Sequence, residues 1–256
     1  MKNIEFTDGT LFVSAIRFLS YIAPTIMIKF KSDRKITLNA VSEGGDTAGV
    51  IEVAPESVKL TPIGGGMDGD CVAFPITMFK KFKTLVKVGD PLVLKFERQG
   101  TVTIRIGEQF AYRVISEPID QEKVEFLSRF SFKYIEKLLV SISTVRSAMK
   151  YIKNEFDEIT LKLENDVLKL LGSSGTATCS IAVTPLKIDR QTEMNIENVY
   201  SVKGLTKILN PALSELTVNT FEIGLSNNSY ISCFLSNANF DLFFYQDPYD
   251  ESDMSN

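Results

Sequence analysis

The stretch PLVLKFERQGTVTIRIGEQFAYRV, residues 91–114, decides how the rest of the chain is interpreted. It holds three short runs rich in alternating apolar residues, at 91–97, 101–106 and 109–114. Gln99-Gly100 and Gly107-Glu108 separate the runs and are typical turn residues. Short alternating runs divided by such turns predict a meander of three antiparallel strands.

A second meander is expected near the C-terminus, and the chain between the two meanders is also rich in strand-like runs. The second meander comprises residues 216–225, 230–235 and 240–245. Further strands are predicted at 26–30, 35–39, 158–163, 167–171 and 176–183.

Four segments show the 3.6-residue spacing of helices: Thr10–Ile22, Pro75–Val88, Lys133–Tyr151 and Ser201–Asn210. The order strand, helix, several strands, short helix and meander then occurs twice. For example, Phe79-x-x-Phe82-x-x-Leu85 corresponds to Val202-x-x-Leu205-x-x-Ile208. This repeat predicts an α+β fold of two similar domains, each with two helices on antiparallel sheets. We expect domains at 1–117 and 126–248, a polar connector at 118–125 and an acidic tail at 249–256.

The charge is distributed unevenly over these elements. The chain has 28 Lys and Arg against 32 Asp and Glu, a net charge of -4. The four predicted helices hold a net +10, so -14 is left for the remainder. A single lysine stripe is usually a solvated helix face. The same bias on three of four helices in an acidic chain instead favours a surface that contacts phosphates without reading bases.

The composition excludes several kinds of chemistry. Because the chain has no histidine, it can form no Ser-His-Asp triad, Cys-His pair or histidine metal site. Cys71, Cys179 and Cys233 are too far apart for a metal motif or a disulfide framework, which suggests a reducing compartment. The glycine-rich loop 64–70 lacks the Gly-Lys-Ser/Thr of a nucleotide-binding loop and the final glutamate of an EF-hand. We therefore expect no cofactor, metal or catalysis, and we find neither a signal-peptide layout nor a membrane span.

The order of elements, the repeat and the basic helices resemble those of DNA sliding clamps. The likeness is to the proliferating cell nuclear antigen (PCNA) type and, in layout, to the clamps of T-even-like phages. It is carried by four stretches: LFVSAIRFL at 11–19, ITLNAV at 36–41, FKYIEKLL at 132–139 and FDLFFYQDP at 240–248.

The resemblance implies a closed ring of three subunits with helices lining the hole around duplex DNA. It implies a DNA polymerase and an ATP-driven clamp loader as partners. The absence of long basic runs disfavours a nuclear import signal, so we expect the cytoplasm of an infected bacterial host as the location. DNA-facing residues would be Arg17, Lys80, Lys81, Lys83, Lys87, Lys133, Lys137, Arg146, Lys150, Lys203 and Lys207. The subunit interface would use Phe110, Tyr112, Val114, Ala177, Cys179 and Ile181. A partner pocket would lie at Val41, Pro118, Ile119, Val124, Tyr245, Gln246, Asp247 and Pro248.

Two alternatives to the clamp stay open at the level of the sequence. One is a β-rich structural or adaptor protein, such as a virion component, whose lysines only solubilise it. The other is a histidine-free enzyme that uses paired carboxylates, although no pair in the sequence favours that chemistry.

Overall fold

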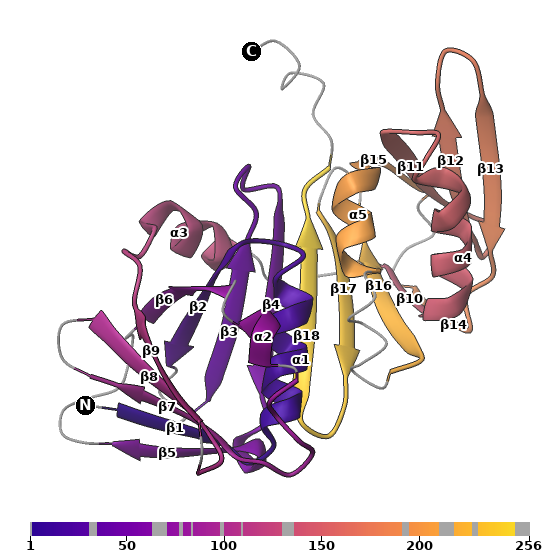
Figure 1. Ribbon diagram of the computed structural model, residues 1–256. Helices are drawn as coiled ribbons and strands as arrows, with labels where there is room; N and C mark the ends of the chain where they lie inside the picture. The colour runs from indigo at the N-terminus through magenta and orange to yellow at the C-terminus, as the bar shows by residue number, and fades with distance from the viewer. Residues whose placement is uncertain are drawn as a thin grey trace. The chain divides into compact units, whose positions relative to one another are not determined.

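The computed structural model describes residues 2–30, 35–62, 71–76, 79–82, 84–97, 100–108, 110–129, 136–190, 195–209, 218–226 and 230–248 (Figure 1). The chain forms two compact units. The first comprises residues 1–129 with 236–242, and the second comprises residues 130–235 with 243–256. The acidic tail predicted at 249–256 lies outside the described residues.

The first unit begins with a strand followed by a helix and ends with a three-strand meander and a helix. Its elements are β1 (Lys2–Phe6), α1 (Gly9–Leu19), β2 (Thr25–Phe30), β3 (Ile36–Val41), β4 (Thr47–Val53), a 3₁₀ turn (Pro55–Ser57), β5 (Val58–Pro62), β6 (Cys71–Pro75), α2 (Phe79–Phe82), β7 (Leu92–Phe96), β8 (Thr101–Ile106), β9 (Phe110–Ile115) and α3 (Gln121–Arg129).

The second unit repeats the order of the first as far as its meander. Its elements are β10 (Glu136–Ser141), α4 (Ile142–Ile152), β11 (Glu158–Glu164), β12 (Val167–Ser173), β13 (Thr178–Val183), β14 (Lys187–Arg190), β15 (Ile196–Ser201), α5 (Val202–Ile208), β16 (Thr220–Leu225), β17 (Ile231–Ser236) and β18 (Phe240–Gln246). The last residue of β17 and residues 240–242 of β18 group with the first unit.

The sheet topology confirms the predicted repeat. In the first unit the strands follow the orders β5-β1-β7-β8-β9 and β4-β3-β2-β6. In the second unit they follow the corresponding orders β14-β10-β16-β17-β18 and β13-β12-β11-β15. The ladders within each unit are antiparallel. The fold is therefore α+β with two similar domains, as the sequence predicts.

Each unit buries one face of its helices, but with different chemistry. The core of the first unit contains a row of aromatic rings. Phe12 contacts Phe6 and Phe79 with ring centroids 4.1 and 5.6 Å apart, and Phe82 contacts Tyr112 at 4.8 Å. The core of the second unit is mainly aliphatic, with Val145, Met149, Leu161, Leu170 and Leu205 buried together.

The helix predicted at Lys133–Tyr151 is wrong for residues 136–141, and residues 133–135 lie outside the described residues. Residues 136–141 form strand β10, in which Glu136, Leu138 and Val140 are buried and the residues between them are half-buried. The helix α4 begins only at Ile142. Leu138 is buried on one face of β10 and also lies four residues before Ile142, the first residue of α4. The apolar residues therefore keep a helical spacing across the end of the strand, so the spacing places the start of the helix too early.

Two other predictions about helices also differ from the structure. The helix predicted from Pro75 to Val88 is a strand end, β6, followed by the four-residue α2. The segment 118–125, predicted as a polar connector with no helix assigned to it, contains the start of α3. Asp120 stabilises that start, since its Oδ1 accepts hydrogen bonds from the backbone N–H groups of Glu122 and Lys123 at 3.1 and 3.4 Å.

Candidate nucleic-acid interface and strand edges

Helix α4 presents a basic, polar outer face. Ile142, Val145, Ala148, Met149 and Ile152 are buried on its inner face. The opposite face carries the exposed side chains of Ser143, Thr144, Ser147, Lys150 and Tyr151, with Arg146 half-buried beside them. The spacing of the buried residues fixes this division, because positions three and four apart share one helix face.

Helix α5 is shorter and has the same arrangement. Val202, Leu205 and Ile208 are buried, whereas Lys203 is exposed and Lys207 is half-buried. Ser201 caps the helix, since its Oγ accepts a hydrogen bond from the backbone N–H of Gly204 at 3.4 Å.

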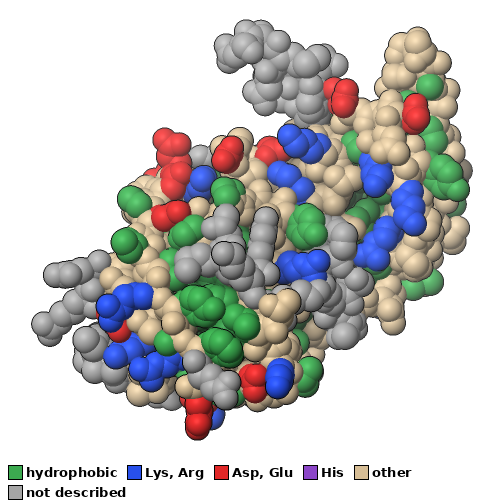
Figure 2. Space-filling view, viewed as in Figure 1, with side chains coloured by type: hydrophobic (Ala, Val, Ile, Leu, Met, Phe, Trp, Pro, Cys, Tyr) green, Lys and Arg blue, Asp and Glu red, His purple; other side chains and the backbone are tan. Residues whose placement is uncertain are grey.

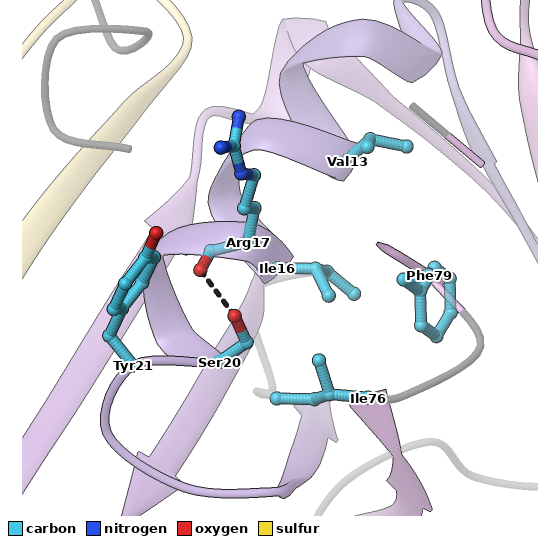
Figure 3. A pocket seen from close by; sticks show the side chains of 7 residues that line it. All are labelled: Val13, Ile16, Arg17, Ser20, Tyr21, Ile76 and Phe79. Atoms are coloured by element: carbon cyan, nitrogen blue, oxygen red, sulfur yellow. Dashed lines mark hydrogen bonds between the residues drawn. The ribbon is translucent and has the colours of Figure 1, made fainter. Parts of the chain in front are cut away.

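In the first unit, Arg17 of α1 borders a recess of about 470 Å³ (Figure 3). Ile16, Ile76 and Phe79 line the recess but are only 0, 1 and 2% exposed. Among the described lining residues, the reachable surface therefore comes mainly from the polar side, where the side chains of Arg17 and Tyr21 extend in the same direction (Figure 3). A mixed surface of this kind can contact an anion but offers little apolar area to a ligand.

The four helices α1, α2, α4 and α5 together contain seven Lys or Arg residues and no Asp or Glu. Their net charge is +7, and subtracting this from the whole-chain value of -4 leaves -11 elsewhere. Figure 2 shows Lys and Arg side chains over α4 and α5 of the second unit. The segregation of charge is thus weaker than the +10 and -14 predicted from longer helices, but it has the same sign.

The basic residues predicted to face DNA are not all on helices. Lys137 lies on strand β10, so its predicted placement on a helix is wrong. Lys87 is exposed in the turn after α2, where its backbone N–H donates to Asp90 Oδ2 at 3.0 Å. Lys83 and Lys133 lie outside the described residues; the backbone of Lys80 and Lys81 is part of α2. Arg17, Arg146, Lys150, Lys203 and Lys207 are on helices as predicted.

Strands β9 and β13 each lie at the edge of their sheet. The hydrogen bond from Ser116 N–H to Gly100 C=O fixes which residues of β9 pair with β8. Because antiparallel pairing alternates, the backbone groups of Ala111, Arg113 and Ile115 turn away from β8. In β13, the hydrogen bond from Ser174 N–H to Ala177 C=O fixes the pairing with β12 in the same way. The backbone groups of Thr178, Ser180 and Ala182 therefore point away from β12.

An open groove of about 640 Å³ lies between α4 and β13. Ala148, Tyr151, Cys179 and Ile181 contribute to its lining. Tyr151 is 73% exposed, which is unusual for a large aromatic side chain without a partner surface. On the other edge strand, Phe110 and Ile115 are 38 and 78% exposed. Each edge therefore combines open backbone groups with exposed apolar side chains.

The residues predicted for a partner pocket differ greatly in exposure. Val41, Tyr245 and Gln246 are almost completely buried. Pro118 is exposed, and Ile119, Val124, Asp247 and Pro248 are half-buried. No local pattern predicts the burial of a glutamine, although the glycine inside the helical run 201–210 is a signal that another side chain approaches there.

A metal site requires several ligands close together, and an activated cysteine requires a lowered pKa. Within the described ranges, no group of three or more Cys, Asp or Glu residues is placed to hold a metal ion. Asp68 and Asp70 lie outside those ranges. Burial raises the pKa of the Cys71 thiol and that of the Cys233 thiol, so neither is an activated nucleophile. No helix among the described residues is long and apolar enough to cross a membrane.

The arrangement of two repeated units, each with helices on antiparallel sheets, is the fold of DNA sliding clamps. Among solved structures, PCNA from Thermococcus kodakaraensis is similar, with a TM-score of 0.76 and 15% identity over 97% of this chain and 100% of that one. The PCNA2–PCNA3 complex from Sulfolobus tokodaii gives 0.73 and 16% over 96% and 98%. A. fulgidus PCNA, solved with the C-terminal region of FEN-1 bound, gives 0.73 and 12% over 98% and 99%.

Comparisons at the level of sequence give no match. No protein-family model matches the chain, and no curated protein matches it. The likeness to archaeal PCNA is therefore one of fold, at an identity too low to carry function by itself.

Proposed function

We propose that this chain is the subunit of a DNA sliding clamp, which encircles duplex DNA without sequence preference and tethers a DNA polymerase. The observation that carries the proposal is the segregation of charge: the helices α1, α2, α4 and α5 hold seven basic and no acidic residues in a chain with net charge -4. Lysine contacts to phosphates are weak, salt-dependent and indifferent to sequence, which suits a protein that must slide.

The repeat supports closure into a ring. Strand β18 occupies the place in the second unit that β9 occupies in the first, and β13 corresponds in the same way to β4. Both β9 and β13 are edge strands, and we expect β9 of one copy to pair with β13 of a second copy.

Pairing of β9 with the β13 of another copy would use the groove beside α4. Phe110 and Tyr112 would then approach Tyr151, Cys179 and Ile181 of the neighbouring subunit, and two open strand edges would be covered at once. A head-to-tail interface of this kind closes into a ring when the rotation between copies allows it, and three copies are expected from the resemblance.

Further parts of the proposal rest on the resemblance and on the sequence pattern. These are the clamp loader, the homotrimer, the phage type with its bacterial host cytoplasm, the domain limits at 117 and 126, and the partner pocket around Val41 and Pro248. In this proposal the clamp holds enzymes on DNA and catalyses nothing itself. A β-rich adaptor without DNA binding is the competing function, and charge segregation is the feature that argues against it.

A topological experiment separates the two functions. The protein is assembled on a nicked circular plasmid with a clamp loader, or at high concentration without one, and is isolated with the DNA by gel filtration. Retention on the circle followed by release when a restriction enzyme linearises it is expected of a ring. Protein that stays on the linear DNA, or that is never retained on the circle, contradicts the clamp.

A further inference from the structure

Gln246, the last residue of β18, is buried against the beginning of helix α5. Gln246 as a whole is only 1% exposed to solvent. The Nε2–H group donates a hydrogen bond to the backbone carbonyl of Ser201 at 2.9 Å. Because Ser201 immediately precedes α5, this amide joins the end of β18 to the first turn of the helix, and both lie in the second unit (Figure 1).

Gly204 makes room for that amide. A Cβ atom added at Gly204 would lie 2.3 Å from Nε2, 2.5 Å from Cδ and 2.7 Å from Oε1 of Gln246. Contacts this short are not tolerated, so no larger residue fits while Gln246 stays in place. Glycine inside a helix is less favourable than alanine by about 1 kcal/mol, which makes its presence in α5 a cost of the contact.

The other end of the amide adds a second cost. Gln246 Oε1 is buried and has no hydrogen-bond partner among the residues that the structure describes. A buried acceptor left unpaired typically costs about 1–3 kcal/mol, whereas methionine would fill a similar volume without that penalty. The glycine in α5 and the unpaired Oε1 both lower stability. We therefore infer that the contact between Gln246 and α5 holds the helix in position and is not there to stabilise the fold.

Helix α5 depends on such anchors because it is only seven residues long. Three hydrogen bonds hold its start. Ser201 Oγ accepts from Gly204 N–H at 3.4 Å, and Val202 N–H donates to Asp157 C=O at 2.8 Å. The bond from Gln246 is the third, and of these three it is the one that comes from β18.

We propose that Gln246 is a positioning residue that couples α5, with Lys203 and Lys207, to the end of β18, with Asp247 and Pro248. The inference rests on the proposed function, in which the first surface contacts DNA and the second receives a protein partner. Through the Gln246 amide, a displacement of α5 by DNA would change the end of β18.

Hydrogen exchange of the full-length protein, followed by mass spectrometry, tests the contact first without DNA. In Gln246→Met the amides of the first turn of α5 should exchange about fivefold faster, as expected for the loss of one ordinary hydrogen bond. The midpoint of thermal unfolding should nevertheless stay equal or rise, because the unpaired acceptor is gone. Gln121→Met, the same substitution at an exposed site on α3, should change neither quantity. Unchanged exchange in Gln246→Met overturns the proposal.

The second arm adds a short duplex DNA in excess at low salt. In the wild-type protein, DNA should slow exchange in α5 and also alter exchange at residues 242–248; in Gln246→Met, the change in α5 should remain and the change at 242–248 should disappear. An equal response at 242–248 in both proteins, or none in wild type while α5 responds, overturns the coupling. If α5 itself shows no response to DNA, the proposed contact between α5 and DNA is wrong. The coupling of the partner surface to DNA is then wrong as well. The first arm still tests the hydrogen bond between Gln246 and Ser201.

Discussion

Single residues decide the packing of the second unit, and Gly172 is the clearest case. A Cβ atom at this position of β12 would lie 2.7 Å from Cδ2, 2.8 Å from Cγ and 3.0 Å from Cε2 of Phe156. Phe156 is buried and has little freedom to move away. Gly172 is therefore required by the shape of the core.

We expect Gly172→Ala to lower the free energy of unfolding by about 1–3 kcal/mol, because it overpacks the core against Phe156. Chemical denaturation measures the change. Gly175→Ala is the control, since a Cβ at Gly175 meets no atom within 4 Å. Gly172→Ala combined with Phe156→Leu should recover part of the loss. A neutral Gly172→Ala would contradict the packing described.

The buried thiol of Cys233 makes stability depend on pH. Complete burial raises its pKa above the ordinary value of 9.0, because desolvation disfavours the thiolate. In the unfolded chain the thiol ionises near pH 9, whereas in the folded chain it stays protonated. The contribution of this group is fully present below pH 9 and is lost as the pH rises toward the folded pKa.

We therefore expect the free energy of unfolding to fall above pH 9, with this group contributing up to about 1.4 kcal/mol per pH unit. Cys233→Val should remove that part of the slope in denaturation curves measured from pH 8 to 10.5. Ile231→Val, which alters the lining of the same small cavity, should lower stability equally at every pH and leave the slope intact. An identical slope in Cys233→Val and the parent protein is the result that speaks against this account.

At the scale of elements, the outer faces of α4 and α5 are where DNA binding is expected to respond to charge. The double substitution Lys150→Glu with Lys203→Glu changes two exposed side chains and no buried one. We expect weaker duplex binding and a slope of log K against log salt that falls by about 0.9 for each phosphate that the protein no longer neutralises. Fluorescence anisotropy at several salt concentrations measures both quantities.

The matched control for this prediction is Lys29→Glu with Lys187→Glu, which makes the same change of charge at exposed positions on β2 and β14. It should have a smaller effect, limited to the general field of the protein. If both double variants weaken binding equally, the helices have no special part in contacting DNA.

At the scale of the whole molecule, assembly is expected to depend on the two open strand edges. Ala111 and Ala182 are exposed and turn their backbone groups away from the adjacent strand. Proline at either site removes an outward N–H group and leaves the ladder within the chain intact. Sedimentation should show about three times 28.6 kDa for the parent protein and a monomer for Ala111→Pro or Ala182→Pro.

The fold of each variant is checked by its circular dichroism spectrum, which should match that of the parent protein. A well-folded Ala111→Pro that still forms the parent assembly would show that β9 is not the joining edge. Tyr112→Pro removes an N–H group that pairs with β8 and should destabilise the subunit itself, so it marks the effect of disrupting the internal ladder.

The sequence by itself determined the repeat, the fold class and the sign of the charge on the helices. Two local properties carry this information: the alternation in runs such as 101–106, and the 3.6-residue spacing of Val202, Leu205 and Leu209. Both can be recognised in the sequence without knowledge of tertiary contacts. The tertiary structure alone decided where β10 ends and α4 begins, that Lys137 lies on a strand, and that a helix follows Asp120. It also brought Gln246 onto Gly204, 42 positions away along the chain. Burial and close approach are set by neighbours distant in sequence, and no local pattern encodes them.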